Sequence, residues 1–231
     1  MSASVVKHNT AEKQTIAEKN NSVEKRSRHL HRSAVLARIL VAAETVFAES
    51  GLDGATMAEV AAAAKVPKAN LHYYFATKEG LYSTVLENIL KFWLDAVDCI
   101  QPDADPHVAL TSYIRAKMDL SRTRPLASKV FANEIIHGAM LAKTYLNSIL
   151  RRRVDEKVEV ISGWIAKGLM DPVDPRHLLF LLWAMTQTYA DFSSQISSVL
   201  NKENLDNEDF KAGEELIIKM TLQGCGVKIR L

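Results

Sequence analysis

The sequence predicts an all-α protein of nine helices, with a three-helix head followed by a larger helical body. Apolar residues recur at helical spacing along most of the chain, and no segment shows the sustained alternation of a β-strand. Several periodic segments begin with a helix start signal, such as Asp-Pro or a capping threonine. We expect three parts: a disordered basic arm over residues 1–32, a head over residues 33–80 and a body over residues 81–231.

The composition is that of an ordinary globular protein, with 48% hydrophobic and 24% charged residues. The longest apolar run, from Leu178 to Met185, is far shorter than the ~20 residues that span a bilayer. No signal peptide is visible at the N-terminus. Cys99 and Cys225 are the only cysteines, too few for a metal site or a disulfide framework. We therefore expect a cytoplasmic protein without a metal or cofactor.

The first 32 residues carry an excess of positive charge, with seven Lys or Arg against three Glu, whereas the whole chain has a net charge of +2. They lack hydrophobic periodicity and are rich in polar residues, which is typical of disorder. Such a segment is either a solvated tail or a basic arm that reaches into a DNA groove. The cluster from Lys25 to Arg32 favours the second interpretation for its own residues only.

Residues 33–49 have the apolar spacing of the first helix of the head. Thr56, with Glu59 three residues later, forms a capping box that starts a second, short helix. Pro67 suits the start of a third helix that runs through residues 68–74, because its missing N–H costs nothing there. Two short helices joined by a tight turn predict a helix-turn-helix.

The third helix carries more polar and aromatic groups than so short a helix can bury, and at least one of the adjacent Tyr73 and Tyr74 should point outward. We interpret its exposed side as a surface that contacts DNA, since asparagine can read adenine and lysine can read guanine or contact phosphate. The helix N-termini at Thr56 and Lys78 suit backbone phosphates. Two scaffold helices without a DNA role are the alternative. The expected DNA-binding residues are Arg28, Arg32, Thr56, Lys68, Ala69, Asn70, His72, Tyr73 and Lys78.

A fourth helix is expected from Lys78 to about Ile100, long enough to act as a rod between head and body. Asp105-Pro106 and Asp174-Pro175 predict two later helix starts. We interpret the basic run Arg151–Arg153 as a solvated face or as salt bridges between subunits rather than as a second DNA site. The remaining helices are expected over residues 106–122, 125–137, 140–166, 175–200 and 210–222.

The helix expected over residues 175–200 is too polar in its middle for a plain core helix. At about 100° per residue, one stripe contains Trp183, Gln187, Asp191 and Ser194, and the opposite stripe contains Leu181, Met185, Thr188, Phe192 and Val199. We expect the first stripe to line a ligand pocket together with Trp93 of the rod helix, and the second to pack against another subunit. An indole beside an amide and a carboxylate suits a small planar polar ligand. Solvent exposure of these polar groups is the alternative.

None of the common catalytic patterns is present, so we expect a protein that is not an enzyme. The seven histidines show no H-E-x-x-H or Cys/His spacing. The sequence also has no glycine-rich phosphate loop and no G-x-S-x-G segment. A helical enzyme acting on a nucleobase and a DNA binder without sequence preference are the alternatives from other classes.

The segment from Arg38 to Leu86 strongly resembles the DNA-binding head of the TetR family, through Val41–Thr56, Asn70–Phe75 and Thr77–Tyr82. The resemblance implies a homodimeric one-component transcriptional regulator, usually a repressor, whose last two helices pair into a four-helix bundle. It also implies that an inducer bound in the body moves the rod helix and the heads. Pro67 departs from the pattern, because the family commonly has Ser or Thr there to cap the recognition helix.

The body resembles the pyrimidine-utilisation regulator (RutR) subgroup, most clearly from Trp183 to Phe192. This resemblance implies a pyrimidine base such as uracil or thymine as inducer. Gln187 and Asp191 suit the donors and acceptors of such a ring, and Trp93 or Trp183 could stack on it. An inducer from a different catabolic or efflux operon is the alternative. We therefore expect a dimer that leaves a pseudo-palindromic operator when it binds this ligand.

Overall fold

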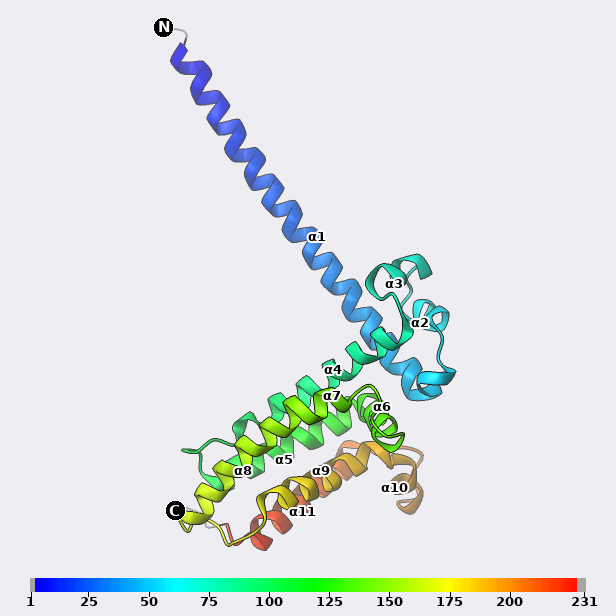
Figure 1. Ribbon diagram of the computed structural model, residues 1–231, viewed down its shortest axis with the longest axis vertical. Coiled ribbons are helices and arrows are strands. Elements are labelled where there is room, and N and C mark those ends of the chain that lie inside the picture. The colour runs from blue at the N-terminus through cyan, green and yellow to red at the C-terminus, as the bar shows by residue number, and fades with distance from the viewer. Residues whose placement is uncertain (1–2, 228–231) are drawn as a thin grey trace.

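The computed structural model describes residues 3–227, and for residues 3–25, 28 and 29 it describes the backbone alone. The described residues form helices and turns without a strand, which confirms the all-α prediction. A long first helix, α1 (Ala3–Gly54), leads into a small head, and the later helices form an elongated body beside it (Figure 1). No described helix is both long enough and apolar enough to cross a membrane.

Helix α1 extends much further toward the N-terminus than the sequence predicted. Its backbone is helical from Ala3, whereas the sequence predicted a helix start at Ser33 after a disordered arm. No glycine or proline occurs before Gly51, so the sequence contains no residue that would stop the helix. Gly51 itself, with φ 66° and ψ −179°, produces the kink near its end. Only glycine adopts this backbone conformation readily.

The head is formed by α1, α2 (Met57–Ala63), α3 (Lys68–Tyr74) and the first half of α4 (Lys78–Ala96). The capping box at Thr56 is confirmed, since its hydroxyl accepts from the N–H of Glu59 while the Glu59 carboxylate accepts from the N–H of Thr56. Thr77 caps α4 by accepting from the N–H of Gly80 at 3.0 Å. Phe47 and Leu71 are buried among the apolar residues that close the head core.

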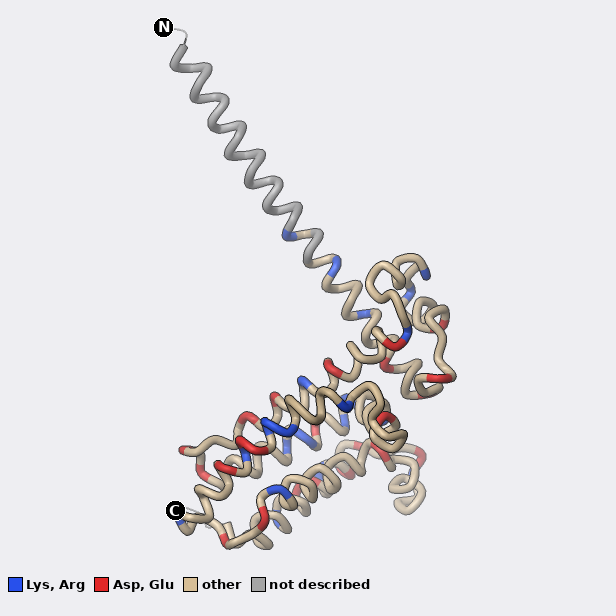
Figure 2. Tube along the Cα trace, in the orientation of Figure 1, with Lys and Arg blue, Asp and Glu red and all other residues tan. Residues whose placement is uncertain are grey.

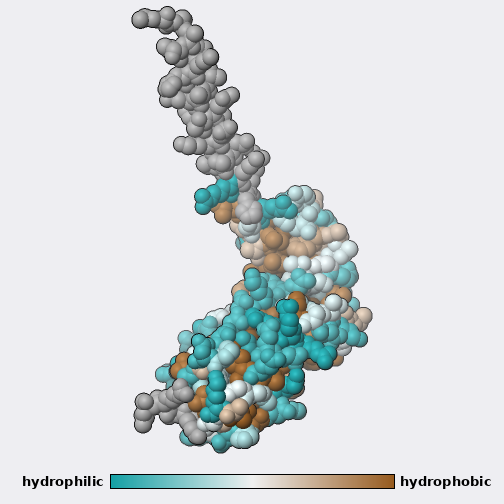
Figure 3. Space-filling view, turned by 60° about the vertical axis from the view of Figure 1, so that its left-hand side comes forward, coloured by the Kyte–Doolittle hydropathy of each residue, from teal (hydrophilic) through white to brown (hydrophobic). Residues whose placement is uncertain are grey.

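The body contains the remaining helices, and the proline-containing start signals are confirmed at Asp105 and Asp174, whose carboxylates accept from the first backbone N–H groups. Its elements are a 3₁₀ turn (Val97–Cys99), α5 (Pro106–Thr123), α6 (Pro125–Ile136), α7 (Lys143–Tyr145), a π-helical turn (Leu146–Leu150), α8 (Arg151–Ala166), α9 (Pro175–Asp191), α10 (Ser193–Val199) and α11 (Asn207–Gly224). Most of the body surface in Figure 3 is hydrophilic, with apolar residues exposed in separate groups.

Two of the expected long helices are divided. The segment over residues 140–166 consists of α7, the π turn and α8, and the segment over residues 175–200 breaks at Phe192 into α9 and α10. Phe192 has φ −115° and ψ 28°, outside the helical range, and neither proline nor glycine marks this break in the sequence. The rod α4 also ends earlier than expected, at Ala96.

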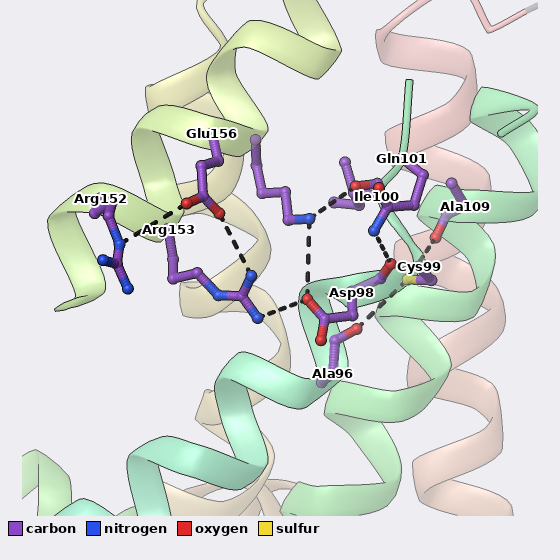
Figure 4. A network of polar contacts seen from close by, with 10 residues as sticks. Ala96, Asp98, Cys99, Ile100, Gln101, Ala109, Arg152, Arg153 and Glu156 are labelled. Carbon is purple, nitrogen blue, oxygen red and sulfur yellow. Dashed lines mark hydrogen bonds and ion pairs between the residues drawn. The ribbon is translucent and has the colours of Figure 1, made fainter. Parts of the chain in front are cut away.

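The basic run of α8 is held by ion pairs within the chain (Figure 4). Arg153 pairs with Asp98 of the 3₁₀ turn at 2.7 Å, and Arg152 pairs with Glu156 at 3.8 Å. Lys157 donates to the carbonyl of Ile100 at 2.9 Å. The contacts of Arg153 and Lys157 fix α8 against the end of the rod, whereas Arg152 is exposed and pairs within α8, as expected of a solvated face.

Candidate functional site

Helix α3 presents one buried anchor and an otherwise exposed surface. Leu71 is fully buried in the head core and thereby fixes the helix. Tyr73 is 72% exposed and Tyr74 is half-buried, which confirms that at least one of the two tyrosines points outward. The expected DNA-contacting residues of this helix are all exposed: Lys68, Ala69, Asn70, His72 and Tyr73.

Arg32 of α1 lies against the aromatic end of α3. Its guanidinium carbon is 5.6 Å from the ring centre of Tyr73 and 5.7 Å from that of Tyr74. A guanidinium within about 6 Å of a ring is attracted by its π-electrons. The structure therefore brings together the basic end of the arm and the recognition helix. The side chain of Arg28, also expected to bind DNA, lies outside the described residues.

The two residues expected at helix N-termini are engaged within the head. The Lys78 ammonium donates to the carbonyls of Asp53 and Ala55, at 3.2 and 3.0 Å, so it ties α4 to the end of α1. Thr56 is exposed, but its hydroxyl belongs to the capping box. Pro67 occupies the N-cap position of α3 without a side-chain hydrogen bond, as expected. The Lys78 ammonium therefore keeps one donor for a phosphate, beside the backbone N–H at the start of α4.

Charge is unevenly distributed over the head. In Figure 2 the described part of α1 and the region of α3 show mainly Lys and Arg, whereas acidic residues lie near α2 and the end of α1. Positive charge concentrated around α3 and the neighbouring part of α1 is the electrostatic pattern expected for DNA binding.

A cavity of about 890 Å³ lies in the body between α4, α5, α6, α8 and α9. This volume is within the usual range for small-molecule sites. Trp93, Trp183, Gln187 and Asp191 all line it, as the sequence predicted. Ala48 of α1 also lines it, so one helix of the head forms part of the wall.

The prediction that Ser194 lines the ligand cavity was wrong. Ser194 is not among the lining residues and is exposed on α10. The helix breaks at Phe192, so the 100° spacing used for the prediction does not continue beyond Asp191. The division into two opposite stripes is also incomplete, because Thr188 and Phe192 of the second stripe line the cavity.

The polar groups of the cavity differ in how far they are already satisfied. The indole N–H of Trp183 donates to the Tyr113 hydroxyl at 2.8 Å, and the Ser128 hydroxyl donates to the Asp191 carboxylate at 2.5 Å. The Gln187 amide makes no hydrogen bond within residues 3–227. Gln187 and the second oxygen of Asp191 are therefore available to a ligand.

Lys117 of α5 is a cavity residue that the sequence analysis missed. It is only 3% exposed, and its ammonium lies 4.3 Å from the ring centre of Trp93. Burial lowers the pKa of Lys117 to about 7, although the negative charge of Asp191 acts in the opposite direction. Burial likewise raises the pKa of Asp191, against the effects of the Ser128 hydrogen bond and the nearby lysines. A lysine four residues after the buried Tyr113, on the apolar face of α5, is the signal that could have revealed it.

Both the head and the body of the chain match known protein-family models. Residues 39–85 match the family model described as bacterial regulatory proteins, tetR family. Residues 86–228, more than half of the chain, match the model described as YcdC-like protein, C-terminal region. The chain belongs to the TetR family. It is therefore a DNA-binding transcriptional regulator rather than an enzyme, and α2 and α3 are its helix-turn-helix.

Two HTH-type regulators are similar to this chain over most of their length. The HTH-type transcriptional regulator RutR of Escherichia coli K12 is 39% identical over 186 residues, which cover 80% of this chain and 88% of RutR. The HTH-type transcriptional repressor NicS of Pseudomonas putida is 29% identical, covering 74% of this chain and 82% of NicS.

Solved structures of TetR-type regulators share the fold. A transcriptional regulator from Streptomyces coelicolor, SCO4942, superposes with a TM-score of 0.65 at 23% identity, covering 83% of this chain and 98% of that one. AibR in complex with isovaleryl coenzyme A and operator DNA superposes with a TM-score of 0.62 at 21% identity, covering 80% and 97%. At these identities the likeness concerns the fold alone.

Proposed function

We propose that this regulator is a dimeric repressor that leaves its operator when a pyrimidine base such as uracil or thymine binds in the cavity of the body. The observation that carries this proposal is the presence of two indole rings, an unengaged amide and a carboxylate around one cavity, in a chain related to RutR. A regulator of another catabolic or efflux operon, with a different inducer, is the alternative.

The cavity chemistry suits a planar ring with an imide edge. The flat rings of Trp93 and Trp183 offer stacking surfaces, and both line the cavity. A pyrimidine base presents a carbonyl, an N–H and a second carbonyl along one edge. Gln187 can both donate and accept, and the Asp191 carboxylate can accept the ring N–H. The Gln187 amide makes no hydrogen bond among the described residues, so it is free to bond the ring. Without Gln187, the polar groups of the bound ring that face it would lack a partner.

The exposed apolar residues of α9 and α11 support dimer formation. Phe180 and Leu181 are 46% and 59% exposed, and Leu216 and Met220 are 56% and 59% exposed. Monomers rarely leave a group of large apolar side chains in contact with water. A second copy of the chain, packed through the same two helices, would cover both pairs and place two heads on one operator.

A mechanism follows from the position of α4. Its N-terminal half belongs to the head core, whereas Trp93 near its other end lines the cavity. A ligand that contacts Trp93 can therefore tilt the helix that carries the head. A helix-turn-helix dimer needs its two recognition helices one groove repeat apart, so a small tilt weakens operator binding.

The proposal is tested by combining a thermal-shift screen with a mobility-shift assay on an operator selected from random DNA with the purified protein. We expect uracil or thymine to raise the unfolding midpoint and to release the selected operator, while 1,3-dimethyluracil, which lacks the imide N–H, does neither. Release by a chemically unrelated compound, with no response to any pyrimidine, would favour the alternative inducer. Equal binding to all DNA sequences would contradict the regulatory role.

A further inference from the structure

Lys117 is an unusual side chain for the interior of a ligand cavity. It is 3% exposed, lines the cavity, and makes no hydrogen bond or ion pair within residues 3–227. Its ammonium lies over the ring of Trp93, 4.3 Å from the ring centre. A buried ammonium normally has a carboxylate or carbonyl partner, because its lost hydration is otherwise uncompensated.

None of the other described charged residues of the cavity forms a hydrogen bond or ion pair with Lys117, and only the charge of Asp191 acts in its favour. Arg153 is paired with Asp98, and Lys157 is bonded to the carbonyl of Ile100. Asp191 is the one carboxylate among the described lining residues, and it is bonded to Ser128. The cationic lining residues are Lys117, Lys129, Arg153 and Lys157. The lining residues therefore carry more positive than negative charge, and among those described neither the buried Lys117 nor the half-buried Lys129 has a hydrogen-bond or ion-pair partner.

We propose that the effector binds as an anion and that its negatively charged oxygen is received by Lys117. This inference rests on the proposed function and goes beyond it: among the pyrimidine rings that the cavity binds, those that carry a negative charge at neutral pH, on ring oxygens or on a carboxylate, bind more tightly than the neutral bases uracil and thymine. A negative oxygen at Lys117 gives the ammonium its missing partner through a charge-assisted hydrogen bond. It also leaves Gln187 and the aromatic walls to recognise the ring itself.

Calorimetric titration of four ring compounds into the full-length protein at neutral pH shows which chemical group of the ligand must carry the negative charge. Barbiturate is a pyrimidine ring that has lost its C5 proton and carries the charge on its ring oxygens. Orotate carries a ring carboxylate, uracil is neutral, and benzoate is an anion without the pyrimidine ring. We expect barbiturate or orotate to bind at least about tenfold more tightly than uracil, since hydrogen bonds to charged groups are the stronger ones. Whichever of the two is preferred identifies the acidic group.

The variant Lys117→Met keeps the length of the side chain and removes its charge. We expect it to lower the affinity for the preferred anion about tenfold or more while changing the uracil affinity by less than about threefold. Lys91→Met is the matched control, because Lys91 is exposed on α4 and does not line the cavity. It should leave all four affinities unchanged. Lys117→Gln provides a second uncharged variant if the methionine variant is poorly folded.

The possible outcomes distinguish this inference from the proposed function. Equal affinity for uracil and both anions, or an equal loss for all ligands in Lys117→Met, overturns the inference and leaves a pyrimidine effector in place. Binding of benzoate that depends on Lys117, without binding of any pyrimidine, overturns the pyrimidine effector and supports the anion site. If none of the four compounds binds, both are rejected.

Discussion

The guanidinium of Arg124 holds the carboxylate of Glu44 through two donors, with Nη2 bonded to Oε2 at 2.5 Å and Nε to Oε1 at 3.4 Å. Glu44 is a buried residue of α1, and Arg124 lies where α5 ends and α6 begins. The same guanidinium is 4.9 Å from the ring centre of Phe92 on α4. The pair therefore joins the head to the body at the point where α1, α4 and α6 meet.

Replacing Arg124 with alanine should weaken the connection between the two parts. We expect the free energy of unfolding to fall by about 2–3 kcal/mol, because a largely buried carboxylate is left without its partner. We also expect the effector to cause a smaller change in operator affinity, measured as the ratio of dissociation constants with and without uracil. Arg122→Ala is the control, since its pair with Asp119 is exposed and contributes little. An unchanged ratio in Arg124→Ala would show that this pair has no part in the response.

Substitutions on α3 should separate base recognition from phosphate contact. Asn70→Ala should cost about 1–3 kcal/mol on the selected operator and much less on random DNA, because an asparagine reads base edges. Lys68→Ala should weaken both and reduce the salt dependence of binding by about one counterion. Mobility-shift titrations at several salt concentrations measure both effects. Salt-independent binding by the unmodified protein would argue against the DNA interface.

The Gln187→Ala variant should lose the ligand response while it keeps its operator affinity. The amide lines the cavity far from α3, and its loss removes a hydrogen bond to the ring, so ligand affinity should fall about tenfold. Thermal shift with uracil and operator titration without it measure the two properties. Gln195→Ala on the exposed side of α10 is the control. A normal thermal shift in Gln187→Ala would remove this residue from the site.

The pH dependence of stability should report the buried ammonium of Lys117. Its pKa is lowered from 10.5 to about 7 in the folded protein, so the unfolded chain binds more protons between these values. Stability therefore rises with pH across this range, and the full penalty is present below pH 7. Lys117→Met should raise the unfolding midpoint by roughly 5 °C at pH 6–7, with a smaller difference at pH 9. Thermal unfolding followed by circular dichroism at each pH provides the test.

The double substitution Leu216→Glu with Met220→Glu should separate the dimer. Both side chains are exposed on α11 one helical turn apart, so the charges would lie at the centre of the proposed interface. We expect a monomer in sedimentation analysis, with a loss of operator affinity of a hundredfold or more because two half-sites are no longer bound together. Lys219→Glu, which reverses a charge on the same helix without removing an apolar side chain, should have a smaller effect. A variant that stays dimeric would place the interface elsewhere.

Local signals predicted much of this structure because they depend on neighbouring residues only. The capping box at Thr56, the cap at Thr77 and the start signals at Asp105 and Asp174 are each decided within a few residues. The apolar spacing within each helix then identified the core sides. These features were sufficient for the all-α fold and for the helix-turn-helix.

The remaining features depend on contacts between distant segments. The break at Phe192 has no marker in the sequence, and for this reason Ser194 was placed on the wrong stripe. The role of Lys117 becomes visible only when α4 and α9 are packed against α5, since Trp93 and Asp191 are far from it in sequence. Periodicity places Lys117 on the apolar face of α5, but it does not show which residues of other helices surround its ammonium.

Ala48 lies on a helix of the head and yet forms part of the cavity wall. A chimera that combined this body with the head of a relative would therefore also replace a piece of the effector site. A substitution at Ala48 would therefore change the cavity wall and the head helix at the same time.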